Sequence, residues 1–196
     1  MGGSNNVGTI FRVDPDGTVN TMITFGGGIG GYPQEGLIQA NDGSFYGTTY
    51  QSGGEANGSI FRMTPEGVFT TLHWFDCSQG EGIGPICRLM QTPDGGLYGT
   101  TFYGGASGCM GNSSGTAFRI TTNGVFTTVV SFDRTNGANP QCGLILGRDR
   151  ALYGSTTGLT GDAYGTIFRL TTNGLLSTLH TFNVEVDGSL WQLAVG

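Results

Sequence analysis

The segment Gly8-Thr9-Ile10-Phe11-Arg12 begins a pattern that the chain repeats three more times. The copies are Gly58-Ser59-Ile60-Phe61-Arg62, Gly115-Thr116-Ala117-Phe118-Arg119 and Gly165-Thr166-Ile167-Phe168-Arg169. Their spacings are 50, 57 and 50 residues, and the extra residues of the middle spacing fall around Cys109. Because repetition at such a period is the sequence mark of propellers and solenoids, this pattern decides the fold more strongly than any single residue.

Each copy belongs to a unit of four short apolar or β-branched runs, which we letter a to d. Run c is the Ile-Phe-Arg copy itself, and a turn that ends in glycine leads from it to the Thr-rich run d. Run d ends in a recurring phenylalanine: Phe25, Phe75, Phe132 and Phe182. Run a comprises Leu37-Ile38, Leu89-Met90 and Leu144-Ile145, and run b comprises Tyr46-Gly47-Thr48, Tyr98-Gly99-Thr100 and Tyr153-Gly154-Ser155. Short runs of this composition, separated by turn residues, predict β-strands.

Four strands in each unit of about 50 residues predict an all-β fold, namely a β-propeller of four four-stranded repeats with one blade incomplete. We assign residues 1–196 to a single repeat domain, with repeats at approximately 1–43, 44–95, 96–150 and 151–196. A β-solenoid is the alternative, but its coils are usually shorter than this period.

The residues that recur in every unit are expected to have structural roles. The phenylalanines should pack between blades, so replacing Phe61 or Phe118 by alanine should destabilise the fold. The glycine in the middle of run b should mark a close approach of neighbouring backbone. The recurring arginine should pair with an acid or stack on an aromatic ring.

Two longer phrases carry a family resemblance. GTIFRLTTNGLLSTLHTF at residues 165–182 and GLIQANDGSFYGTTYQSGG at residues 36–54 resemble the GloVer (Gloeo/Verruco) tandem repeat of secreted bacterial proteins. The resemblance covers nearly the whole chain. It implies export, often with a surface anchor, although no anchor segment follows here, and it implies no particular activity.

The composition excludes some classes of function. Only 11% of residues are charged, the net charge is −6, and all eight basic residues are arginines, four of them inside the repeat. Nucleic-acid binding needs a basic surface, so we expect no nucleic-acid partner. No apolar stretch is long enough to span a bilayer, so we expect no membrane insertion. A charge-poor surface rich in Gly, Thr, Ser and Asn favours an extracellular or cell-surface location.

The four cysteines fit two disulfides in an oxidising compartment. We predict the pairs Cys77–Cys87 and Cys109–Cys142. The residues of the first pair bracket one d–a connection, and those of the second should share one face of the molecule. Since Cys87 and Cys142 occupy the same repeat position, we expect them to be held apart. Their spacing does not suit zinc, and we expect neither a metal nor a cofactor.

The b–c and d–a connections should emerge together on one face, because a blade's chain runs up, down, up and down. These connections are the long ones, and loops on a rigid scaffold often carry function. They contain four tyrosines that we predict as binding residues: Tyr32, Tyr50, Tyr103 and Tyr164. Tyrosines among small polar residues can stack on a sugar ring or a peptide and hydrogen-bond to it.

Catalytic signals are few. Asp76 and Asp133 share one repeat position and are the best acid candidates, with Glu35, Glu55 and Glu81 in nearby loops. A pair of carboxylates at a suitable separation would permit glycoside hydrolysis. His73 and His180 also share a repeat position, which Ile23 and Val130 hold in the other units, and this indicates repeat drift.

We therefore predict an exported binding module that recognises a glycan or a protein through the b–c and d–a face. The sequence favours a binding protein over an enzyme. One alternative is a polysaccharide hydrolase that uses loop carboxylates. Another is a purely structural or filament-forming surface protein.

The ends of the sequence raise the question of ring closure. The chain starts just before a run c, and residues 187–196 resemble the start of another run a. This gives four a, three b, four c and four d strands, so one b strand is missing where a ring would close. Proteins avoid leaving such strand edges open, and three solutions exist. The N-terminal residues could fill the gap poorly, further residues could supply the strand, or chains could join edge to edge into a larger ring or a filament. We expect the last of these, a homo-oligomer joined head to tail.

Overall fold

The computed structural model describes residues 6–51, 57–106, 108–109, 114–158 and 163–183. The chain is all-β, as predicted, with antiparallel pairing throughout the described strands. The described residues include two short 3-10 turns, η1 (Gly27–Ile29) and η2 (Cys77–Gln79). No described helix is long and apolar enough to cross a membrane.

Three four-stranded sheets follow the predicted order of runs a, b, c and d. They consist of β3 (Ile38–Gln39), β4 (Phe45–Thr49), β5 (Ser59–Met63) and β6 (Phe69–Trp74); β8 (Met90–Gln91), β9 (Leu97–Thr101), β11 (Thr116–Ile120) and β12 (Phe126–Ser131); and β13 (Ile145–Leu146), β14 (Leu152–Thr156), β15 (Ala163–Leu170) and β16 (Leu176–Asn183). A two-stranded sheet of β1 (Thr9–Val13) and β2 (Val19–Thr24) precedes them, and β7 (Gly82–Ile83) pairs with β10 (Tyr103–Gly104). The predicted three b, four c and four d strands are therefore present, while the fourth run a lies outside the described residues.

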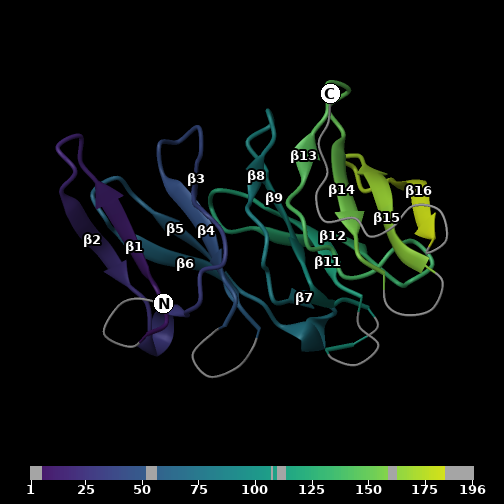
Figure 1. Ribbon diagram of the computed structural model, residues 1–196, viewed down its shortest axis with the longest axis horizontal. Coiled ribbons are helices and arrows are strands. Elements are labelled where there is room, and N and C mark those ends of the chain that lie inside the picture. The colour runs from purple at the N-terminus through teal and green to yellow at the C-terminus, as the bar shows by residue number, and fades with distance from the viewer. Residues whose placement is uncertain (1–5, 52–56, 107, 110–113, 159–162, 184–196) are drawn as a thin grey trace.

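The sheets stand side by side in a row, with β1–β2 at one end and β15–β16 at the other (Figure 1). The a–b and c–d turns gather along the upper side of this view, and the d–a and b–c connections along the lower side. The two faces predicted from the sequence are therefore real, and the longer connections share one of them.

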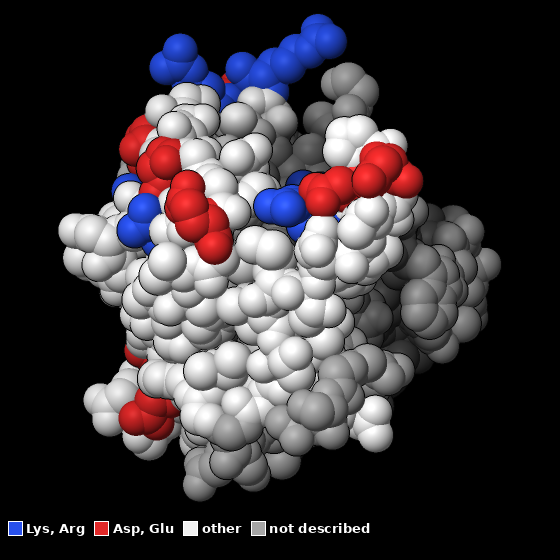
Figure 2. Space-filling model, turned by 90° about the vertical axis from the view of Figure 1, so that its left-hand side faces the viewer, with Lys and Arg blue, Asp and Glu red and all other residues white. Residues whose placement is uncertain are grey.

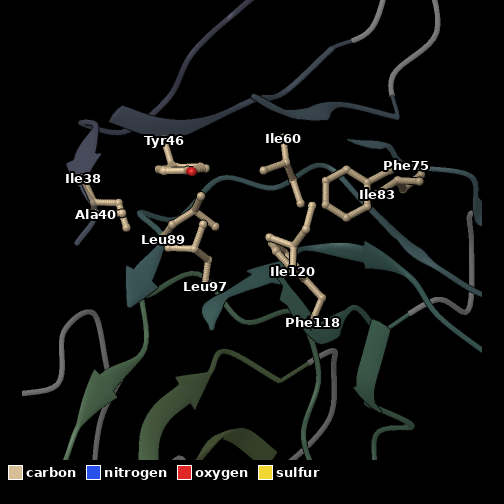
Figure 3. Packing of buried hydrophobic residues seen from close by; sticks show 10 residues of the cluster. All are labelled: Ile38, Ala40, Tyr46, Ile60, Phe75, Ile83, Leu89, Leu97, Phe118 and Ile120. Carbon is tan, nitrogen blue, oxygen red and sulfur yellow. The ribbon is translucent and has the colours of Figure 1, made fainter. Parts of the chain in front are cut away.

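The core lies between neighbouring sheets. Figure 3 shows residues of the β3–β6 sheet, among them Tyr46 and Ile60, above Leu89, Leu97 and Phe118 of the β8–β12 sheet. Phe61 and Phe118 are fully buried, in agreement with their predicted role between blades.

The glycine in the middle of strand b does not meet neighbouring backbone, and this expectation is corrected. A Cβ atom placed on Gly99 would lie 2.5 Å from Cζ of Phe118 and 2.9 Å from Cδ2 of Leu89. Gly47 and Gly154 meet the same two kinds of side chain in their own sheets. The glycine therefore makes room for the buried ring of strand c.

The recurring arginine pairs with an aspartate in the a–b turn of its own sheet. The closest nitrogen–oxygen distances are 3.6 Å for Arg62–Asp42, 3.4 Å for Arg119–Asp94 and 2.7 Å for Arg169–Asp149. In the first and third of these sheets the tyrosine of strand b also donates its hydroxyl to the aspartate. In the β1–β2 hairpin Arg12 pairs with Asp14 instead. The repeat therefore encodes a small polar network that fixes each sheet's turns.

The predicted disulfides are wrong in their pairing. Cys77 is bonded to Cys109, with Cα atoms 4.9 Å apart, while Cys87 and Cys142 carry thiols. Cys77 opens the η2 turn after β6, and Cys109 belongs to the lengthened b–c connection of the next sheet. The disulfide therefore joins adjacent loops of two neighbouring sheets. Cys87, in contrast, is buried just before run a. Burial raises the pKa of Cys87 to about 12.

Candidate functional site

The d–a and b–c connections form a continuous layer because their backbones pair with one another. Tyr50 N donates to the carbonyl of Tyr32 at 3.1 Å, and Phe102 N donates to the carbonyl of Gly84 at 3.0 Å. A bridge between Gly31 and Gln51 and the β7–β10 pair extend the same pattern. This pairing holds side chains of the loop face in fixed positions.

Buried hydroxyl pairs support this layer from below. In each complete sheet a Thr of strand b and a Ser or Thr of strand c share a hydrogen bond, at 2.7 to 2.9 Å: Thr49–Ser59, Thr101–Thr116 and Thr156–Thr166. A glycine of the d–a connection covers each pair so closely that a Cβ atom would clash with a hydroxyl oxygen: Gly30, Gly82 and Gly137. The loops are thus seated on the sheets at equivalent points.

Two of the four predicted binding tyrosines come together around Gly84. A Cβ atom on Gly84 would lie 3.1 Å from Cε2 of Tyr50 and 3.8 Å from Cδ2 of Tyr103. The two rings therefore flank the backbone of one d–a connection, although they come from the b–c connections of different sheets. Tyr103 is 38% exposed and Tyr50 is half-buried. Gly84 has φ of +67°, which suits glycine, and any side chain there would press on Tyr50.

Tyr32 lies beside this pair through its backbone contact with Tyr50. Its φ is +57°, a left-handed conformation that bulky residues rarely adopt. The same repeat position holds Gly84 in the next sheet and Asn139, with φ of +53°, in the one after. A short hydrogen bond from Tyr32 N to the carbonyl of Val7, at 2.6 Å, helps to hold it. The side chain of the fourth tyrosine, Tyr164, lies outside the described residues.

The two catalytic candidates serve as caps of their own turns. Asp76 accepts hydrogen bonds from the backbone N and the hydroxyl of Ser78, at 2.9 and 2.7 Å. Asp133 does the same with Thr135, at 2.9 and 2.7 Å, and also accepts from Asn136 N. The side-chain hydrogen bond is in each case the main cause that lowers the carboxyl pKa. Both carboxylates are therefore held in the ionised form.

The remaining acid candidates differ in their surroundings. Glu81 accepts from His73 Nε2 at 2.8 Å and from Asp76 N at 2.9 Å, and the His73 ring stacks on Phe126 with centroids 3.9 Å apart. His73 thus joins two neighbouring sheets. Glu35 is exposed, and Glu55 lies outside the described residues. Within the described part of the chain, no three His, Cys, Asp or Glu side chains form a group that could hold a metal ion.

A cavity of about 580 Å³ lies between the three a strands and is lined by residues 38–39, 88–91 and 142–145. Among the described residues, its lining combines Ile, Leu and Met side chains with the amides of Gln39 and Gln91 and one charged side chain, Arg88. The guanidinium donates to the carbonyl of Leu37 in the neighbouring sheet at 3.2 Å. A cavity of this size suits a small molecule.

Comparison with known proteins identifies the repeat. The sequence model of the Gloeobacter/Verrucomicrobia repeat matches residues 1–157. This chain belongs to the Gloeobacter/Verrucomicrobia repeat family. The resemblance inferred from the repeated phrases is therefore confirmed. No curated protein matches the sequence significantly.

The fold of this repeat-family chain is also found among solved structures. A crystal structure whose title names it provisionally as a gluconolactonase matches with a TM-score of 0.56 at 17% identity. The match covers 92% of the present chain but only 58% of that one. At this identity the likeness concerns the fold alone, and it fits a propeller-like arrangement of the sheets.

Sequence reasoning found the loop face of the repeat-family chain but missed the cavity. The cavity lies among the a strands, which are so short that only a Leu-Ile type run marks them. Arg88 could have been noticed, because the aligned positions in the other units hold glycine, Gly36 and Gly143. That single difference gave no indication that the three runs would surround a common space.

Proposed function

We propose that this repeat-family chain is an exported β-propeller module that binds glycans on its b–c and d–a face, with Tyr50 and Tyr103 as the stacking rings. The supporting observation is that both rings flank Gly84, in a loop layer held by backbone pairing. Aromatic rings fixed in this way stack on sugars without losing much conformational freedom on binding. A protein ligand would use the same rings.

Export is supported by two properties of the chain. Disulfides persist in oxidising compartments, and Cys77 is bonded to Cys109. The surface is poor in charge and free of lysine. An extracellular or cell-surface location follows as part of the proposal.

A polysaccharide hydrolase is the competing function, and the fold likeness to a protein named as a gluconolactonase keeps it in view. The states of Asp76 and Asp133 weigh against it. A general acid must carry a proton near neutral pH, whereas hydrogen bonds to Ser78 and Thr135 lower both carboxyl pKa values. A purely structural role would leave the tyrosine rings without a ligand.

A glycan array, followed by calorimetry and a reducing-sugar assay on the oligosaccharides that bind, tests these functions together. We expect binding without turnover, and Tyr103→Ala should weaken it at least tenfold, which corresponds to about 1.4 kcal/mol. Tyr103→Phe is the matched control because it keeps the ring, and it should retain most of the affinity.

The other outcomes separate the competing functions. Sugar release that is lost in Asp76→Asn or Asp133→Asn would establish the hydrolase instead. Absence of binding to every glycan would overturn the glycan proposal. Binding that Tyr50→Ala and Tyr103→Ala both leave unchanged would place the site elsewhere, with the cavity at Arg88 as the next position to test.

A further inference from the structure

The contact between neighbouring sheets occurs three times in the described part of the chain. In each contact, the phenylalanine that directly follows strand d lies against the phenylalanine of strand c in the next sheet. The ring centroids are 5.2 to 5.6 Å apart in the pairs Phe25–Phe61, Phe75–Phe118 and Phe132–Phe168. None of these rings is more than 2% exposed. The packing of d on c is therefore the unit that holds the row together.

The β1–β2 hairpin presents one half of this contact without its partner. Phe11 holds the repeat position of Phe61 and Phe118 but is 59% exposed, whereas those two rings are fully buried. Val13 is 56% exposed, whereas Met63 at the equivalent position is 4% exposed. Both residues belong to the face of strand c that would meet a preceding strand d.

Strand β16 presents the other half. At the equivalent position of strand d, Met22, Leu72 and Val129 each lie under the c–d turn glycine of the next sheet. A Cβ atom placed on the glycine would lie 3.1 Å from the nearest atom of Met22 at Gly67, 3.5 Å from Leu72 at Gly124 and 3.7 Å from Val129 at Gly174. Leu179 holds this position in β16 and is 53% exposed.

The missing neighbour of Leu179 has its counterpart at the start of the chain. The turn glycine of the β1–β2 hairpin, Gly17, has nothing within 4 Å of its Cβ position, unlike the three equivalent glycines. The two unsatisfied halves are thus complementary, position by position: Phe182 to Phe11 and Leu179 to Gly17. They lie at opposite ends of the row in Figure 1, and so do not meet within one chain.

The surface at the β1–β2 end fits such a contact. Figure 2 looks onto this end, and its acidic and basic side chains lie mainly over the upper half, with a further acidic group at the lower left. Below the upper band the described surface is mostly uncharged. Exposed Phe and Val side chains beside such a surface suit an apolar partner of the same repeat.

We propose that β16 of one copy of this chain docks on the β1–β2 hairpin of a second copy, continuing the d-on-c contact across the chain boundary. The two surfaces differ, so the association is heterologous and gives a ring when the rotation closes. In the described residues, two copies together supply six four-stranded sheets and two β1–β2 hairpins. These eight units reach the upper end of the usual range of propeller blades, so a ring of two copies is the largest that this range allows and is the assembly we expect.

Light scattering after size exclusion, from about 1 to 200 µM, measures the association. The expected mass is twice the chain mass of 20.4 kDa. Phe11→Glu and Leu179→Glu should each raise the dissociation constant at least tenfold. Val68→Glu is the matched control: Val68 is 61% exposed but lies in the c–d turn of an inner sheet, and its replacement should leave the mass unchanged. A mass of one chain at every concentration would overturn the proposal.

Cysteine cross-linking tests the orientation. Gly17→Cys and Leu179→Cys, prepared as separate variants and mixed under mild oxidation, should form a covalent dimer that neither variant forms alone. A dimer from either variant alone at the same yield would show a like-to-like contact and overturn the head-to-tail arrangement. The mixed cross-link together with a mass of three or more chains would retain the docking but overturn the ring of two.

Discussion

Replacing Phe118 by alanine tests the packing between sheets most directly. The ring is fully buried and lies between Phe75 and Phe126, at centroid distances of 5.3 and 5.6 Å. Its tip fills the space that Gly99 leaves open. Truncation of a buried phenylalanine costs about 3–5 kcal/mol, through lost burial and the cavity left behind. For a chain of this length that corresponds to a fall in Tm of roughly 6–20 °C.

The matched control is Phe11→Ala, because Phe11 holds the same repeat position but is 59% exposed. In urea or thermal unfolding at high dilution, it should cost less than about 1 kcal/mol. At high protein concentration the Phe11→Ala deficit should grow, because Phe11 then lies in the contact between chains, while the Phe118→Ala deficit should not change. Equal losses at the two positions at high dilution would refute the repeated d-on-c contact.

Four further outcomes follow from single features of the chain. Gly99→Ala should lower the free energy of unfolding by about 1–3 kcal/mol, because its Cβ atom would meet the Phe ring of strand c; urea titration measures this. Arg150→Gly should raise the free energy of unfolding by up to about 1 kcal/mol in the same assay, because Arg150 has φ of +62° in a turn where two other sheets have glycine. Non-reducing peptide mapping should recover Cys77 linked to Cys109, and reduction should cost about 3–4 kcal/mol in the chain-entropy model. The hydrogen bond from Arg169 lowers the pKa of Asp149 in the folded chain, so ionised Asp149 stabilises the fold above its unfolded pKa of 3.8. This stabilisation is lost as the pH falls through the folded pKa, and Asp149→Asn should flatten the acid side of the pH–stability curve.

Two of these predictions have close controls in the same chain. Gly36→Ala should be nearly neutral, because nothing lies within 4 Å of its Cβ position. Arg148→Gly changes the same turn as Arg150→Gly without relieving a positive φ, and should not stabilise the fold. A loss in Gly36→Ala as large as in Gly99→Ala, or a gain in Arg148→Gly equal to that in Arg150→Gly, would contradict the local explanations.

The period of the sequence was enough to predict strands, their order and the two faces. Copies of the Ile-Phe-Arg run at nearly constant spacing predict equivalent environments, and Phe61, Phe118 and Phe168 are buried as expected. The expectation is wrong for Phe11, because in the described residues its hairpin has neither a strand b of its own nor the strand d of a preceding sheet. The same dependence on neighbours explains why the sequence suggested self-association without naming the residues in contact.

The disulfide was missed because spacing along the chain says little about distance between loops. Cys77 and Cys87 are close in sequence, yet Cys87 lies in the buried start of run a, and Cys77 meets Cys109 across two sheets. The carboxylates Asp76 and Asp133 were equally ambiguous, because an aspartate after a strand can serve as a turn cap or as an acid. Only the positions of Ser78 and Thr135 show that both act as caps.

The sequence by itself determined the all-β class, the four-strand unit, the repeat family and the loop face, because each of these depends on residue types at short, regular spacing. The tertiary structure alone decided that Tyr50 and Tyr103 flank Gly84, that the three a strands surround a cavity with Arg88, and that the two ends carry complementary faces. These depend on how neighbouring sheets are placed, and that placement follows from packing between residues more than 30 positions apart, such as Phe25 with Phe61 and Tyr50 with Gly84.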